Sequence, residues 1–125
     1  MNTTIVSIVF PFLPPSMNRC YRTFRDKVYK SKLYTDYEKQ MKTFLSDRDD
    51  LVDLKITGKV KLEITFYKKG GRQFDTDNRL KSFIDSIEHV LIEDDYNVHE
   101  LVVRKHNHSI EDKTLLVITP IEHSV

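Results

Sequence analysis

Two pairs of aspartates bracket one helical segment of this sequence. Asp75 and Asp77 stand two residues apart at its start, and Asp94 and Asp95 follow its end. Residues two apart in an extended chain point to the same side, so the first pair can offer both carboxylates to one ligand. Carboxylate oxygens are the donors that Mg²⁺ and Mn²⁺ prefer. These ions stabilise the leaving oxygen of a phosphodiester, so the spacing indicates a candidate site for phosphodiester hydrolysis.

Helix capping explains some of the same residues without a metal. Asp77 stands at the expected start of the helix, where aspartate is a favoured cap and the helix dipole favours negative charge. Lys81, four residues later, could form a surface ion pair with Asp77 or assist the charge that develops in a reaction. Asn78 could orient a ligand or a water. Capping and metal binding both remain open on spacing alone.

The length of the helix decides whether the two acidic pairs can meet. Apolar residues at helical spacing predict a helix over about 78–91. They are Leu80, Phe83, Ile84, Ile87, Val90 and Leu91. Such a helix is about 21 Å long, which places Asp95 far from Asp75 in one straight chain. The pairs meet if the helix is shorter or bends, or if a second chain of a two-fold dimer supplies one of them. Otherwise Asp94 and Asp95 form a solvated turn.

The surrounding pattern predicts the scaffold that positions these residues. Strands are expected over 4–10, 59–67, 101–103 and 115–118, with the last two forming a hairpin around SIEDK. A first helix is expected from Ser31, as its N-cap, to about Leu45. Its buried stripe is predicted to be Leu33, Tyr37, Met41, Phe44 and Leu45. Residues 17–30 are expected to be a loop or a short ribbon. The order predicts an α/β (α+β) two-layer domain, a small mixed four-stranded sheet with two helices on one face.

Length and composition exclude several classes of protein. The 125 residues fit one domain, 1–125, and the single cysteine, Cys20, cannot form an internal disulfide. No apolar run approaches the ~20 residues of a membrane span. The sequence has no P-loop and no Gly-rich dinucleotide motif, so no nucleotide cofactor is expected. We therefore expect a cytoplasmic protein that is not bound to a membrane.

Charge is unevenly distributed although the net charge is only +1. Between Met17 and Phe44 there are eight basic and three acidic residues. Such a segment is typical of a surface that faces a polyanion, and equally of an ordinary solvated face. Three aromatic residues are interleaved with these charges, namely Tyr21, Phe24 and Tyr29. They could stack on unpaired bases or pack within the loop.

Three segments in order resemble the RusA family of Holliday junction resolvases: PPSMNRCYR, FDTDNRLKSFIDSI and IEDDYNVHEL. That family consists of small homodimeric endonucleases found largely in phages and prophages. The resemblance implies a RusA-like fold and Mg²⁺-dependent paired nicking of four-way DNA junctions, with Mn²⁺ as a possible substitute. It implies that Asp75, Asp77 and Asp95, or the neighbouring Asp94, bind the metal, and that Lys81 is catalytic.

In such an enzyme, basic residues of two segments would hold DNA phosphates, which positions the DNA without reading its sequence. The residues expected to bind DNA are Asn18, Arg19, Arg22, Lys68, Lys69, Arg72 and Asn78. Two other functions remain open. The protein could be a non-catalytic DNA-binding module whose acidic residues only cap and turn, or a metal-dependent nuclease for another branched DNA.

Overall fold

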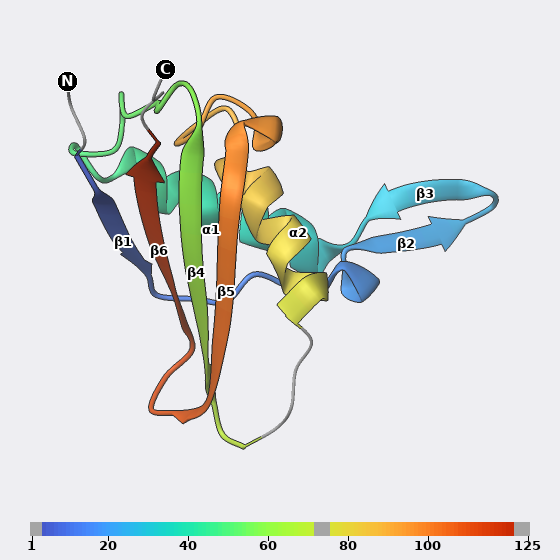
Figure 1. Ribbon diagram of the computed structural model, residues 1–125. Helices are drawn as coiled ribbons and strands as arrows, with labels where there is room; N and C mark the ends of the chain where they lie inside the picture. Colours follow the sequence, from blue (N-terminus) through green and yellow to red (C-terminus); the bar gives the residue numbers. More distant parts are fainter. Residues whose placement is uncertain (1–3, 72–75, 122–125) are drawn as a thin grey trace.

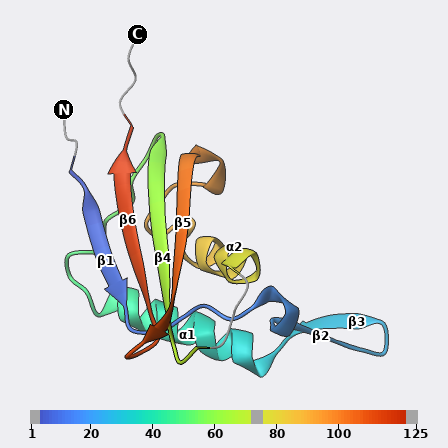
Figure 2. The same ribbon diagram turned by 60° about the horizontal axis from the view of Figure 1, so that its bottom comes forward.

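A four-stranded mixed sheet forms one layer of the molecule, and two helices form the other. The computed structural model describes residues 4–71 and 76–121. The strands are β1 (Val6–Phe10), β4 (Val60–Lys69), β5 (Val98–Ser109) and β6 (Lys113–Pro120), in the order β1-β6-β4-β5. Helices α1 (Lys32–Ser46) and α2 (Thr76–Ile87) lie on one face of this sheet (Figures 1 and 2). The predicted class, two layers with a mixed four-stranded sheet, is confirmed.

Strand β4 lies at the centre of the hydrophobic core. Its alternating residues Val60, Leu62, Ile64 and Phe66 are fully buried, as the period of two predicts. They pack with buried residues of the other elements, including Ile8, Phe10, Tyr37, Met41, Phe83, Ile87, Leu116 and Ile118. Burying each large apolar side chain contributes about 1.5–3 kcal/mol, so this layer contact fixes both helices on the sheet.

Helix α1 begins where the sequence predicts. The Ser31 hydroxyl accepts a hydrogen bond from the Tyr34 amide at 3.2 Å, which satisfies one of the first amides of the helix. The predicted stripe is wrong at its first position, because Leu33 is 43% exposed and Tyr34 is buried instead. Tyr34 lies three residues before Tyr37, so the buried face keeps helical spacing with this replacement.

Helix α2 ends at Ile87 and not at the predicted Leu91. His89 has φ 68°, the left-handed conformation that commonly ends a helix, and its amide donates to the Ile92 carbonyl at 2.7 Å. The following segment bonds to Ile56 instead: the Ile56 amide donates to the Leu91 carbonyl at 2.9 Å. Leu91 and Ile92 are therefore buried by a non-helical turn, which local periodicity could not distinguish from one more helical turn.

The predicted hairpin between the last two strands is wrong. Strand β4 lies between β5 and β6, so that Leu62 pairs with Leu101 on one side and Ile118 on the other. β4 and β5 are parallel, and α2 connects them. Parallel neighbours need such a crossover connection, and this one carries α2 past the face of the sheet.

Residues 17–30 form the short ribbon rather than a loop. A 3-10 turn, η1 (Met17–Arg19), leads into an antiparallel hairpin of β2 (Tyr21–Phe24) and β3 (Lys27–Lys30). The hairpin projects away from both layers (Figures 1 and 2). A second 3-10 turn, η2 (Asp95–Asn97), precedes β5. Within the described ranges, no helix has the length and apolar character needed to cross a membrane.

Candidate active site

A groove of ≈ 430 Å³ runs along α2 beside β5. Its lining residues are Asp77, Leu80, Lys81, Ile84, Asp85, Asp95, Val98, His99 and Leu101. β5 is an edge strand of the sheet, so this side of it has no neighbouring strand within the described chain. The groove thus combines three carboxylates, one amine and one imidazole with apolar side chains from α2 and β5. Such a surface has the donors to hold a divalent cation and a phosphate.

The carboxylates of Asp77 and Asp95 reach this groove from opposite ends of α2. Asp77 lies in the first turn of the helix. Asp95 lies beyond its last turn, where the Asp95 amide donates to Glu88 Oε2 at 2.8 Å. The eleven residues from Asp77 to Glu88 rise by roughly 16 Å. The early end of α2 therefore returns Asp95 to the same groove of its own chain as Asp77. Asp75 lies outside the described residues.

Lys81 points along the same groove and pairs with the next acidic residue of the helix. Its Nζ lies 3.5 Å from Asp85 Oδ2, an i,i+4 contact in which the lysine side chain is 66% exposed. The surface ion pair considered for Lys81 thus forms with Asp85. Exposed pairs of this kind contribute little, so the amine can leave Asp85 for a bound phosphate at small cost.

Asp94 and Asp95 form a carboxyl cluster with Glu88. The protonated Asp95 carboxyl donates a hydrogen bond to Asp94, and this bond and the negative charge of Glu88 raise the pKa of Asp95 above its usual value. For Asp94, desolvation acts to raise the pKa, but hydrogen bonds from Asp95 and the Tyr96 amide outweigh it and lower the pKa. Like charges held this close repel each other, and a bound cation removes that cost.

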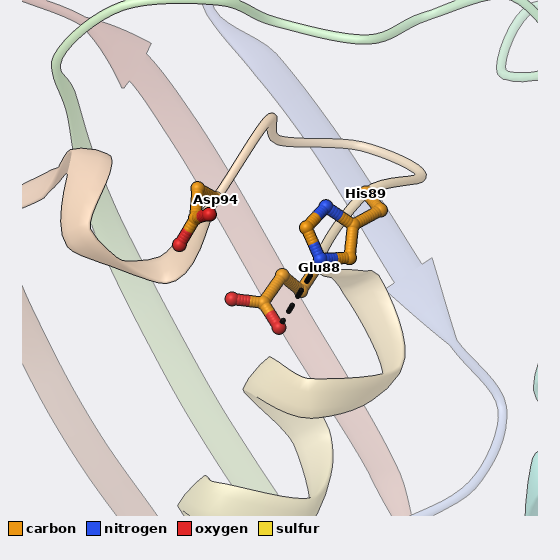
Figure 3. Close-up of side chains that lie close together, drawn as sticks. All are labelled: Glu88, His89 and Asp94. Carbon is orange, nitrogen blue, oxygen red and sulfur yellow. Dashed lines mark ion pairs between the residues drawn. The ribbon is translucent and has the colours of Figure 1, made fainter.

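Asp94 also lies with an imidazole that the sequence gave no reason to select. Glu88, His89 and Asp94 each offer one ligand atom, and these atoms lie within 4.8 Å of one another (Figure 3). His89 Nε2 is 3.7 Å from Glu88 Oε1. One imidazole with two carboxylates is a suitable ligand set for Mn²⁺ or another first-row metal, just as a set of oxygen ligands alone is suitable for Mg²⁺. The helix was expected to continue through residues 88–91, so nothing in the sequence pattern indicated that Glu88 and His89 lie beside Asp94.

His99 is a second groove residue that the sequence did not select. Val60 pairs with Val98 and Lys61 pairs with Glu100, so His99 is an extra residue in β5 at this point. An irregularity of this kind re-aims a side chain relative to strict alternation, and His99 lines the groove together with Val98. The irregular register depends on the parallel pairing with β4, which the sequence pattern did not reveal.

The proline segment before η1 is held against α2. Arg79 Nη1 donates to the Pro14 carbonyl at 2.7 Å, and the buried Ser82 hydroxyl donates to the Pro15 carbonyl at 2.7 Å. Burial lowers the pKa of the Arg79 guanidinium, opposed by the charge of Asp112. The two hydrogen bonds fix η1 beside the start of α2 (Figures 1 and 2). Pro14 and Pro15 have no amide hydrogen to donate, and their carbonyls accept these two hydrogen bonds from α2.

A family model described as Endodeoxyribonuclease RusA matches residues 11–118. The chain belongs to the RusA family. No curated protein matches its sequence. RusA proteins are endodeoxyribonucleases that act on Holliday junctions, so the predicted family and nuclease class are confirmed.

The residues expected to bind DNA come from several elements of this RusA protein. Asn18 and Arg19 are exposed on η1, and Arg22 is exposed on β2. Lys68 is half-buried and Lys69 exposed at the end of β4, and Asn78 is half-buried in the first turn of α2. Arg72 lies outside the described residues. Arg19 and the unpredicted Arg79 line a second hollow of ≈ 420 Å³, which adds a desolvated cation to this side of the RusA fold.

Proposed function

We propose that this protein is a Mg²⁺-dependent endonuclease that resolves four-way DNA junctions by paired, symmetrical nicks. The observation that carries the proposal is the α2 groove, in which Asp77, Lys81 and Asp95 face one surface in a chain of the RusA family. We further propose that residues 1–125 act as one endonuclease domain in the cytoplasm of a bacterial or phage-infected cell.

The proposed metal ligands are Asp75, Asp77 and Asp95, with Asp94 as the alternative to Asp95. The bound ion would supply Lewis-acid stabilisation of the scissile phosphate. Asp77, in the first turn of α2, presents its carboxylate where the amides of the helix start give the anion further support. Lys81, one turn further along, donates to the phosphate oxygens as negative charge grows on them.

The proposed phosphate-binding residues orient the DNA over this groove. Asn18, Arg19 and Arg22 approach from η1 and the hairpin, and Asn78 from the start of α2. Lys68, Lys69 and Arg72 would hold the strand on the side of β4. None of these contacts requires a particular base, which suits an enzyme that selects DNA by its branched shape.

The proposal predicts strict dependence on both metal and branch. In about 10 mM Mg²⁺, the purified protein should nick an immobile four-way junction. A concentration of this order is needed because carboxylate sites bind Mg²⁺ weakly and the ion keeps several of its waters. Linear duplex of the same sequence should remain intact, and EDTA should stop all cleavage. Mn²⁺ should restore cleavage. Junction binding without cleavage in either metal would instead identify a DNA-binding module.

We also propose that the enzyme is a homodimer, because two symmetrical nicks need two equivalent sites. The distance between Asp77 and Asp95 along α2 raises the question of which chain completes each site. Mixing Asp77→Asn and Asp95→Asn variants answers it. If each site takes Asp77 from one protomer and Asp95 from its partner, a mixed dimer keeps one intact site.

The expected result of this mixing is partial recovery. About half of the dimers formed by exchange are mixed, and one of their two sites is intact, so about a quarter of the wild-type sites return. Single nicks should then predominate over paired nicks. Inactivity of the mixture, with subunit exchange verified, would show that each site is built within one chain. A protein that sediments as a monomer at working concentration would contradict the dimer.

A further inference from the structure

The β2–β3 hairpin has no core of its own. All ten residues from Tyr21 to Lys30 are exposed, and the hairpin projects away from the sheet and contacts α1 only near its base (Figures 1 and 2). An isolated two-stranded hairpin is marginally stable in water. The contacts that anchor the hairpin to the body, and the side chains that it exposes, therefore indicate its role.

The base of the hairpin is firmly attached to the body. The Ser31 amide donates to the Cys20 carbonyl at 2.7 Å, and the Ser31 hydroxyl donates to the Arg19 carbonyl at 2.6 Å. Cys20 is fully buried. Ser31 is also the cap of α1, so one residue ties together η1, the hairpin and the helix.

One face of the hairpin is committed to α1. Cross-strand partners share a face, and this face carries the pairs Tyr21–Lys30 and Thr23–Val28. The Tyr21 ring packs edge-on against Tyr34 at 5.6 Å between centroids. Lys30 Nζ lies 2.9 Å from Glu38 and 5.4 Å from the centre of the Tyr34 ring. Tyr21 is therefore used for anchoring.

The opposite face presents only cations and aromatic rings. Its cross-strand pairs are Arg22–Tyr29 and Phe24–Lys27. Phe24 is 64% exposed and Tyr29 is 49% exposed. Such exposure is unusual for aromatic rings, which folded domains usually bury. Alternating positive charge and aromatic surface is the combination that binds unpaired nucleic acid, through phosphate contacts and base stacking.

The turn sets the twist of this face and places Phe24 next to the tip. Arg25 and Asp26 both have positive φ, 50° and 62°, as a type I′ turn requires. This turn matches the twist of the strands, so the hairpin is preformed. The Arg25 guanidinium lies 5.2 Å from the centre of the Phe24 ring, which supports the ring from the tip side.

We propose that the face formed by Arg22, Phe24, Lys27 and Tyr29 binds unpaired bases at the branch point of the DNA. Phe24 and Tyr29 stack on the bases, and Arg22 and Lys27 hold the flanking phosphates. The proposal rests on the proposed junction-resolving function and assigns branch selection to the hairpin. In continuous duplex the bases already stack on each other, so the rings have no base to stack on.

The test compares a Phe24→Ala/Tyr29→Ala double variant with Val28→Ala in the full chain. Val28 is 67% exposed on the committed face of the same hairpin, so it is a matched loss of exposed apolar surface. Affinities for an immobile four-way junction and for linear duplex are measured in EDTA, which prevents cleavage. 2-Aminopurine at the branch point reports the stacking of the bases.

The double variant should bind the junction about fivefold to a hundredfold more weakly, the range for losing base–aromatic stacking, with little change for duplex. Its 2-aminopurine signal on binding should be lost. Val28→Ala should behave as wild type in each assay. Unchanged junction preference in the double variant, or equal loss for junction and duplex, would overturn the proposal.

This test separates the inference from the proposed function. Hairpin-dependent junction binding by a protein that never cleaves in Mg²⁺ or Mn²⁺ would support the inference and refute the nuclease. Metal-dependent junction cleavage with undiminished selectivity in the double variant would support the nuclease and refute the inference about the hairpin. Circular dichroism should be unchanged in all variants, because the substituted side chains are exposed.

Discussion

Replacing Asp77 by asparagine should abolish cleavage of a four-way junction and leave junction binding within a few-fold of wild type. The substitution keeps the size of the side chain but removes its charge. A divalent ion contributes several kcal/mol to phosphodiester hydrolysis. Each 1.4 kcal/mol is a tenfold change in rate, so the loss should reach about a thousandfold or more. Single-turnover cleavage of a labelled junction measures it.

Two comparisons make the Asp77→Asn result specific. Asp49→Asn removes an exposed aspartate away from the α2 groove and should cleave like wild type. A thermal melt should show Asp77→Asn nearly as stable as wild type, because a carboxylate in the first turn of a helix contributes only about 0.3–1 kcal/mol through the helix dipole. Cleavage within tenfold of wild type would show that Asp77 only supports the first turn of α2, and would refute its role as a metal ligand.

The elements that depend on local pattern could be predicted from the sequence. Alternation in β4 predicted its buried apolar side chains, since a period of two assigns faces without tertiary information, but it did not predict that Thr65 on the opposite face is also buried. Ser31 was predicted as the cap of α1 because a serine hydroxyl just before a helical pattern can accept from an amide of the first turn. The start of α2 was predicted to within two residues, at Asn78 against the observed Thr76.

The errors arose where distant segments decide the structure. A hairpin between β5 and β6 was the simplest expectation for strands close in sequence, but β4 inserts between them. The end of α2 was overestimated because Leu91 is apolar at helical spacing, whereas its carbonyl binds the Ile56 amide. That hydrogen bond joins residues 35 positions apart, and nothing near Leu91 in the sequence signals it.

The residues of the candidate site also divide into those that the sequence pattern predicted and those that only distant segments bring into place. Asp77, Lys81 and Asp95 carry a recognisable pattern, and all three line the groove. His99 enters the groove only through the irregular register of β5 on β4. Glu88 and His89 meet Asp94 only because α2 stops early. The short helix therefore both returns Asp95 to the groove and creates the neighbouring imidazole–carboxylate group.

Replacing Phe83 by alanine should destabilise the protein by about 3–5 kcal/mol, the usual range for a buried phenylalanine. Phe83 is fully buried on α2, and its ring packs edge-on against Phe10 at 5.3 Å and Phe66 at 6.3 Å. Domains of this kind have about 5–15 kcal/mol of total stability, so the loss is a large share. Urea unfolding should show a lower midpoint with an unchanged slope.

The consequence for function follows from where Phe83 lies. It fastens α2, the helix that carries Asp77 and Lys81, to strands β1 and β4. Phe83→Leu keeps most of the buried volume and should lose less stability and retain cleavage. Ile110→Ala, at a position that is 92% exposed, should change stability by less than about 0.5 kcal/mol. If Phe83→Ala were as stable as wild type, α2 would not be packed on the sheet as described. The groove that gathers Asp77, Lys81 and Asp95 would then lose its physical basis.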